Sequence, residues 1–133
     1  MGFAIDLPAA ARRHLVAADA LANERHHGVA GYLYGLAAEC AVKAMMREAG
    51  LLPDANPSRK ANPFFAHFPE LRTVLRDKLQ GRRGTPLTRL IQNDAFMSHW
   101  CVRMRYSHGK DISNAWIKRW AEQARQTVAS IGT

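Results

Sequence analysis

The chain has 133 residues, a length that fits one domain with its own hydrophobic core and leaves no room for a second. Its net charge of +8 is unevenly distributed: residues 1–58 carry 5 basic and 6 acidic side chains (−1), and residues 59–133 carry 14 and 5 (+9). This asymmetry suits a polyanionic partner such as nucleic acid, and from charge alone it suits a solvated basic surface equally well.

The two cysteines, Cys40 and Cys101, lie far apart in apolar segments, which argues against a disulfide framework and a zinc knuckle. The first residues lack the basic and apolar regions of an export signal, and no apolar run approaches the roughly 20 residues that cross a bilayer. We therefore expect a cytoplasmic protein that does not cross a membrane.

Two helices are predicted at the start of the chain. Asp6 is expected to cap a helix that begins near Pro8 and carries an apolar stripe at helical spacing. The segment from 29 to 46 is apolar nearly all round, with Glu39 and Lys43 as its only charges. We expect this second helix to be the central and most buried one.

A long surface loop is predicted over residues 51–67, because its prolines and asparagines forbid a regular helix. Three phenylalanines are expected to pin the end of this loop to the core: Phe64, Phe65 and Phe68. A third helix over 69–79 has leucines four residues apart, and the turn that follows it, residues 80–84, contains Arg82 and Arg83.

Further helices are predicted in the remainder of the chain. Thr85 opens a helical pattern that continues to Met104, as one helix or as two, and Ser113 caps a last helix that extends to Ile131. No alternation typical of strands occurs. The sequence therefore predicts an all-α fold, an up-and-down bundle of four to five antiparallel helices with one long loop, in a single domain over residues 1–133.

Two groups of polar residues in the first half of the chain are interpreted as structural. Glu39 lies in an apolar helix, where an unpaired charge costs several kcal/mol, and we expect an arginine of a neighbouring helix to pair with it. His26 and His27 fall at the junction of the first two helices and are interpreted as a surface turn outside the site.

The densest cluster of functional side chains lies in residues 100–110, which carry three cations and a histidine. Arg103 and His108 are five positions apart, about 140° around an ideal helix, so they share a face only if the helix ends between them, near Ser107. Arg105 and His108 are three apart and are neighbours even if the helix persists.

An arginine, four residues and a histidine at the end of a late helix resemble the motif of the HEPN family, which consists of small all-α domains of prokaryotic toxin, defence and RNA-processing proteins. Arg103 and His108 fit this motif. Three further stretches are similar to the family: GYLYGLAAECAVKAMM in the central helix, the segment from His67 to Leu71, and the block WCVRMRY. Together these stretches cover most of the chain.

The resemblance implies a metal-independent endoribonuclease of the toxin–antitoxin or defence type, with no cofactor. His108 would act as general acid or base and Arg103 would stabilise the phosphate, in a cleft between two identical subunits. Other residues are expected to hold RNA phosphates (Arg105, Lys110, Arg82 and Arg83) or to support the site (Glu39, Tyr106 and Ser107).

Two alternatives remain open. The residue after the motif arginine is usually polar in ribonuclease members but is Met104 here, and WCVRMRY also aligns with Arg105 as the motif arginine, which puts Lys110 in place of the histidine. These features favour a non-catalytic module that binds RNA, a nucleotide or a partner nucleotidyltransferase, such as an antitoxin. The second alternative is a structural bundle in which Arg103 and Arg105 pair with Glu39, Asp94 or Asp111.

Overall fold

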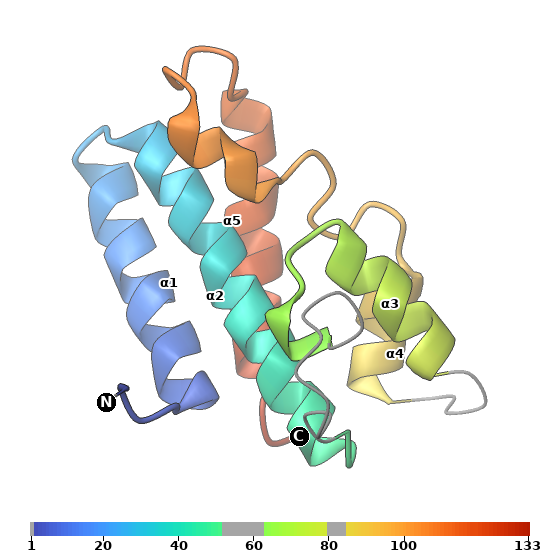
Figure 1. Cartoon of the computed structure of the whole chain (residues 1–133). Coiled ribbons are helices and arrows are strands. Elements are labelled where there is room, and N and C mark those ends of the chain that lie inside the picture. The colour runs from blue at the N-terminus through green and yellow to red at the C-terminus, as the bar shows by residue number, and fades with distance from the viewer. Residues whose placement is uncertain (1, 52–62, 80–84) are drawn as a thin grey trace.

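The computed structural model describes residues 2–51, 63–79 and 85–133. Within these ranges the chain forms α-helices and short 3-10 helices and no strand, so the predicted all-α helical bundle is confirmed. The elements are α1 (Leu7–Asn23), α2 (His27–Glu48), η1 (Pro63–Phe65), α3 (Glu70–Lys78), α4 (Pro86–Gln92), η2 (Val102–Tyr106) and α5 (Asn114–Ala129) (Figure 1). None of the described helices is both long and apolar enough to cross a bilayer.

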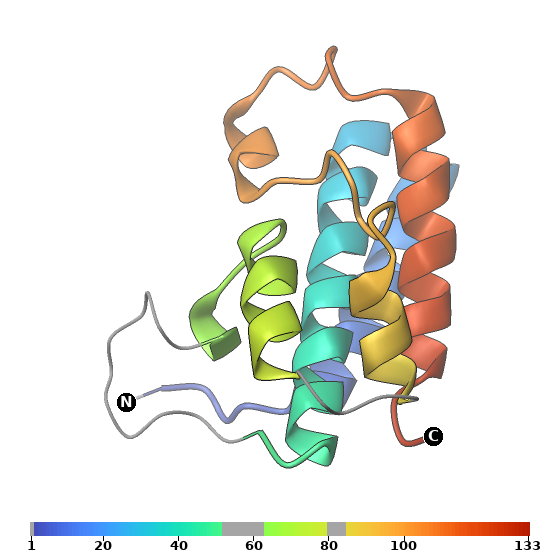
Figure 2. The ribbon, with the colours of Figure 1, turned by 90° about the vertical axis from the view of Figure 1, so that its right-hand side faces the viewer.

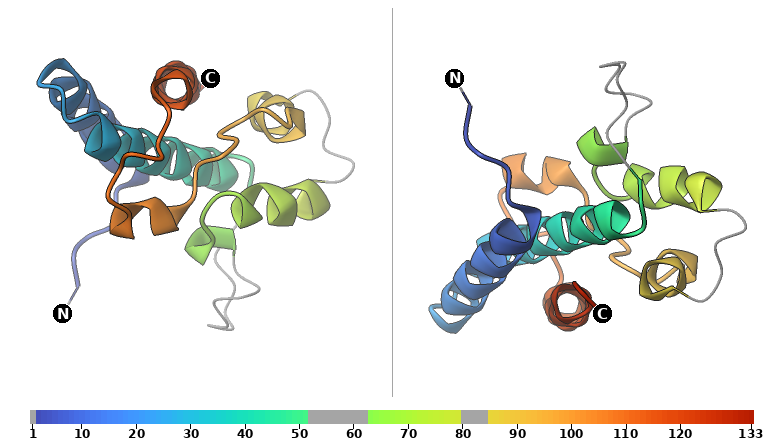
Figure 3. Two further views of the ribbon diagram at one scale, coloured as in Figure 1. Left: turned by 90° about the horizontal axis from the view of Figure 1, so that it is seen from above. Right: turned by 90° about the horizontal axis from the view of Figure 1, so that it is seen from below.

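α2 is the central helix, as predicted. Of its 22 residues 12 are buried, more than in any other described helix. Small residues let its neighbours approach closely: a Cβ atom added at Gly31 would lie 3.2 Å from side-chain atoms of Ile117 and Trp120 in α5. Seen along the bundle, α5 and η2 lie on opposite sides of α2 (Figure 3).

The directions of the helices depart in one detail from a simple up-and-down order. α1 and α2 are antiparallel, but α5 runs in the same direction as α2 (Figure 1). Gly31, near the start of α2, lies beside Ile117, near the start of α5, and the Gly132 N–H donates to Glu48 Oε1 over 2.8 Å where both helices end. The chain reaches the start of α5 because residues 107–113 pass over the N-terminal end of α2 (Figure 2).

Helix caps follow the sequence closely. Asp6 Oδ1 accepts a hydrogen bond from the Ala9 N–H over 3.0 Å at the start of α1. Ser113 Oγ accepts one from the Ala115 N–H over 3.2 Å at the start of α5. Each cap satisfies an N–H that has no partner inside the helix, so these predicted helix starts are confirmed.

The segment between α4 and η2 differs from the prediction, because the helical pattern that continues to Met104 forms no continuous helix there. Met97 and His99 have positive φ values of 53° and 70°. Side chains from other elements bind the backbone instead: Gln123 accepts from the Met97 N–H over 2.8 Å, and Trp120 Nε1 donates to the Ser98 carbonyl over 2.9 Å. These long-range hydrogen bonds replace the bonds that a helix would have supplied.

The loop predicted over residues 51–67 lies mostly outside the described residues, and the turn over 80–84 lies outside them entirely. At the end of the loop Phe68 is buried, Phe64 is half-buried and Phe65 is exposed. Phe68 therefore anchors this end of the segment to the core.

Candidate functional site

The short 3-10 helix η2 presents the cluster that the sequence singled out. A 3-10 helix has three residues per turn, so residues three positions apart share a side. Arg103 therefore shares a side with Tyr106 and not with Arg105. The helix ends at Tyr106, and Ser107 is extended, so a helix end does fall between Arg103 and His108, as a shared face of these two residues would require.

The turn after η2 is fixed by local hydrogen bonds. Ser107 Oγ accepts from the Gly109 N–H over 3.1 Å, and Gly109 has a φ of 86°, a backbone conformation that favours glycine. His108 Nδ1 accepts from the Lys110 N–H over 3.0 Å. With Nδ1 occupied as an acceptor, the neutral imidazole carries its proton on Nε2, and the exposed His108 ring offers an N–H donor to a ligand.

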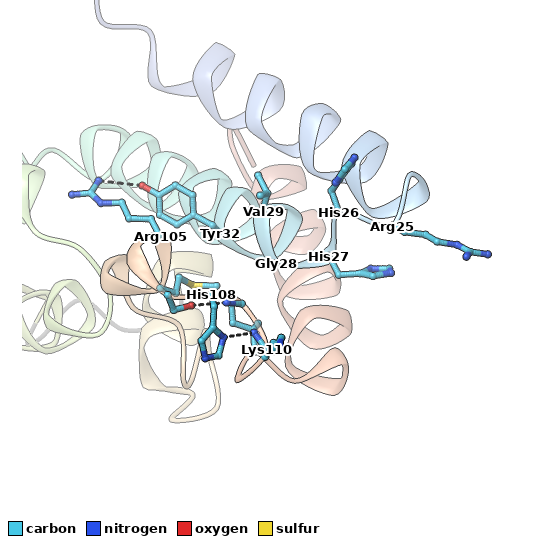
Figure 4. A pocket seen from close by; sticks show the side chains of 13 residues that line it. Arg25, His26, His27, Gly28, Val29, Tyr32, Arg105, His108 and Lys110 are labelled. Atoms are coloured by element: carbon cyan, nitrogen blue, oxygen red, sulfur yellow. Dashed lines mark hydrogen bonds between the residues drawn. The ribbon is translucent and has the colours of Figure 1, made fainter.

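A hollow of about 570 Å³ lies where residues 104–112 meet the first turn of α2; we call it the basic hollow (Figure 4). Its basic lining residues come from two distant parts of the chain: Arg25, His26, His27, Arg105, His108 and Lys110. None of the 13 described residues that line it carries a carboxylate. The basic hollow is therefore suited to an anion.

Arg105 is positioned by two aromatic side chains. Its guanidinium donates to the Tyr32 hydroxyl of α2 over 3.3 Å, as the dashed line in Figure 4 shows, and it lies 5.0 Å from the centroid of the Tyr106 ring. The hydrogen bond to Tyr32 raises the pKa of Arg105 above its ordinary value. Arg105 is therefore a cation at the edge of the basic hollow whose guanidinium is positioned by Tyr32 and Tyr106.

The two residues of the predicted motif are not brought together within one subunit. His108 lines the basic hollow, whereas Arg103 lines a different one of about 510 Å³, which we call the α3 hollow. The α3 hollow also contains Glu70 and Arg72, so it is not free of carboxylates. The alternative pair, Arg105 and His108, does share one hollow.

Glu39 has a partner of a different kind from the one predicted. It is 2% exposed, and its carboxylate accepts from His67 Nδ1 over 2.9 Å and from the Phe68 N–H over 2.8 Å, with no arginine in contact among the described residues. Burial raises the pKa of Glu39, and burial lowers the pKa of Lys43, one turn away. Glu39 therefore ties the chain that enters α3 to α2 and does not border the basic hollow.

The structural alternative, in which Arg103 and Arg105 pair with acidic residues, does not describe the ion pairs seen here. Glu39 pairs with His67, and Asp94 pairs with Arg76. Arg82 and Arg83, which are predicted to contact RNA, lie outside the described residues.

Sequence reasoning missed the contribution of the α1–α2 turn. His26 and His27 are exposed, as a surface turn requires, yet they line the basic hollow together with His108. In Figure 4 the side chains of Arg25 and His27 project away from His108, so the imidazole rings of His27 and His108 do not face one another. The available signal was compositional, since Arg25, His26 and His27 form a basic run where a helix begins, but no spacing rule connects that run to residue 108.

No group of three or more histidine, cysteine or acidic side chains in residues 2–51, 63–79 and 85–133 is arranged to hold a metal ion. Comparisons of the chain with protein-family models, with curated proteins and with solved structures found no match. The similarity to HEPN domains therefore depends on the residues of this chain alone.

Proposed function

We propose that the chain is an RNA-binding module similar to HEPN domains, and that it binds RNA phosphates in the basic hollow. The observation that supports this most is the lining of that hollow, which combines Arg105, His108 and Lys110 with the basic run Arg25 to His27 and has no acidic side chain among its described residues. The net charge of +8 would favour the approach of RNA through the same electrostatic attraction.

The polar groups that line the basic hollow include hydrogen-bond donors and cations, which suit the oxygens of a phosphate. A guanidinium gives paired, charge-assisted hydrogen bonds to phosphate oxygens, and Arg105 is already oriented by Tyr32. His108 offers its Nε2–H while the Lys110 backbone N–H holds Nδ1. These groups recognise the phosphate backbone and no particular base, so we expect affinity that depends strongly on salt and weakly on RNA sequence.

Fluorescence anisotropy with a labelled single-stranded RNA tests this proposal. Arg105→Gln is expected to weaken binding about tenfold and to lower the salt slope by about 1. Arg103→Gln is the matched control, because it removes an exposed cation from the same helix but from the other hollow, and it should change affinity less than about twofold. Equal losses in the two variants, or an unchanged affinity of the parent in about 0.5 M salt, would overturn the proposal.

A second candidate function is the metal-independent endoribonuclease. It is favoured by the presence of an imidazole and a guanidinium, His108 and Arg105, in one hollow. Arg105 would take the phosphate-stabilising role that the family motif gives to Arg103. We place it second because His108 Nδ1 already accepts a hydrogen bond from the Lys110 N–H, which occupies the ring nitrogen that a general base would use. Pairing of two subunits, or of one subunit with a nucleotidyltransferase, stays a prediction.

Catalysis is tested by incubating RNA with the purified chain in the presence of a chelator. An endoribonuclease of this kind would cut RNA under these conditions and would lose that activity in His108→Ala while keeping it in Arg103→Gln. Binding without cleavage by the parent chain, or equal cleavage by His108→Ala, would contradict catalysis at this site and leave phosphate binding in place.

A further inference from the structure

Tyr106 is the last residue of η2, and its large aromatic side chain is 78% exposed. Its two chain neighbours, Arg105 and Ser107, both line the basic hollow. The ring therefore lies at the rim of the proposed phosphate site, and little of its apolar surface is buried against the rest of the chain.

The Tyr106 ring also has a charged neighbour. The Arg105 guanidinium lies over one face of the ring, 5.0 Å from its centroid, which is a cation–π arrangement. This contact orients one face, and the high exposure of the side chain leaves the rest of the ring accessible. An aromatic ring beside an arginine is the combination on which unpaired bases stack in proteins that bind single strands.

We propose that Tyr106 is a stacking platform for a nucleobase of single-stranded RNA whose neighbouring phosphate lies in the basic hollow. This inference rests on the proposed function and adds a class of ligand to it. A duplex has its bases already stacked and offers the ring none of them, so the platform discriminates in favour of unpaired strands. No described residue that lines the adjoining hollow carries a carboxylate, which favours a nucleic acid over a protein segment as the occupant, because no acidic side chain of the lining competes with phosphates for its cations.

The experiment compares three ligands by anisotropy: a single-stranded RNA of about 12 nucleotides, an abasic ribose-phosphate strand of the same length, and the corresponding duplex. The parent chain is expected to bind the single strand about tenfold more tightly than the abasic strand or the duplex. Tyr106→Ala should remove this preference and bind all three ligands alike, whereas Tyr106→Phe, which keeps the ring, should retain it.

Phe65→Ala is a matched control, because Phe65 is another exposed aromatic residue, 51% exposed and outside the basic hollow, and the variant should keep the full preference. If the parent binds single-stranded and abasic strands equally, the stacking inference is overturned while the phosphate site stands. If the parent binds none of the ligands, the proposed function fails. If Tyr106→Ala changes the oligomeric state and leaves the RNA preference intact, the ring is a subunit contact and the inference is overturned.

Discussion

Two neighbouring stretches of α2 differ in their surroundings: one is buried against other elements, and the other borders the basic hollow. Residues 34–39 are enclosed: Gly35 lies against an indole ring, and both oxygens of Glu39 accept hydrogen bonds. Nearer the start of α2, Gly28, Val29 and Tyr32 border the basic hollow, where the Tyr32 hydroxyl accepts from an exposed arginine and several nearby cations have no acidic partner among the described residues.

This difference in surroundings distinguishes polar residues that stabilise the fold from polar residues that can bind a ligand. In the enclosed stretch each charge is satisfied inside the chain, so a substitution there should reduce the free energy of unfolding. Around the hollow the cations remain available to a ligand, so a substitution there should change binding and leave stability nearly unchanged. Substitutions in the two stretches test this division.

The largest effect is expected from Gly35→Ala. An added Cβ atom would lie 1.8 Å from Trp100 Cε2, so the indole must move, and its Nε1–H would lose the hydrogen bond that it donates to the Gly31 carbonyl over 3.1 Å. We expect a loss of about 3 kcal/mol or more in the free energy of unfolding, measured by urea denaturation.

Gly28→Ala is the control for this variant, in the same helix but beside the hollow. Its added Cβ atom would meet Ile112 at 3.8 Å, an ordinary van der Waals distance, and alanine favours a helix over glycine. It should leave the free energy of unfolding unchanged or raise it by up to about 1 kcal/mol. Similar losses in both variants would remove the distinction between the two stretches.

The next effect concerns Glu39. Glu39→Ala leaves the buried Phe68 N–H without an acceptor and should cost about 2 kcal/mol, whereas Glu39→Gln keeps an acceptor and should cost less. Calorimetry or urea denaturation would compare the two variants at one pH.

Glu39 should also make stability depend on pH. Burial raises its pKa in the folded state above the ordinary value of 4.5, so the folded state binds the proton more tightly than the unfolded state. The contribution is complete below pH 4.5 and is lost as the pH rises through the raised pKa. The stability of the parent relative to Glu39→Gln should therefore fall with rising pH. A constant difference would contradict the burial of an ionisable carboxyl at this position.

Local signals were sufficient to predict most of the fold. The caps at Asp6 and Ser113 and the apolar α2 depend on neighbours in the chain, and all of them were found. The bend between α4 and η2 was not predictable in this way, because Gln123 and Trp120 of α5 hold that backbone from outside. Tertiary contacts of this kind override a helical pattern.

The candidate site was predictable in its content but not in its arrangement. Residues 100–110 were identified from charge density, and the pairing of Arg103 with His108 required the helix to end between them. The helix does end there, at Tyr106, yet Arg103 lines the α3 hollow and not the basic hollow. The contribution of Tyr32 could not be read from spacing, since Tyr32 and Arg105 are 73 positions apart and meet only because the chain crosses the end of α2.

The smallest effect comes from two tyrosines of α2 that differ only in their surroundings. Tyr34 is 1% exposed, and its hydroxyl donates to Asp19 Oδ1 over 2.5 Å, so Tyr34→Phe should cost about 1 kcal/mol. Burial, followed by the hydrogen bond to Asp19, raises the pKa of Tyr34 to about 12. The stability that this group contributes is therefore complete below pH 10 and is lost as the pH rises through 12, a loss that Tyr34→Phe should not show.

Tyr32→Phe should leave the urea midpoint unchanged but weaken RNA binding, because it removes the hydroxyl to which Arg105 donates. If Tyr32→Phe instead destabilises the fold as much as Tyr34→Phe, the hydroxyl beside the hollow is structural, and Arg105 is held there for the stability of the bundle and not for a ligand.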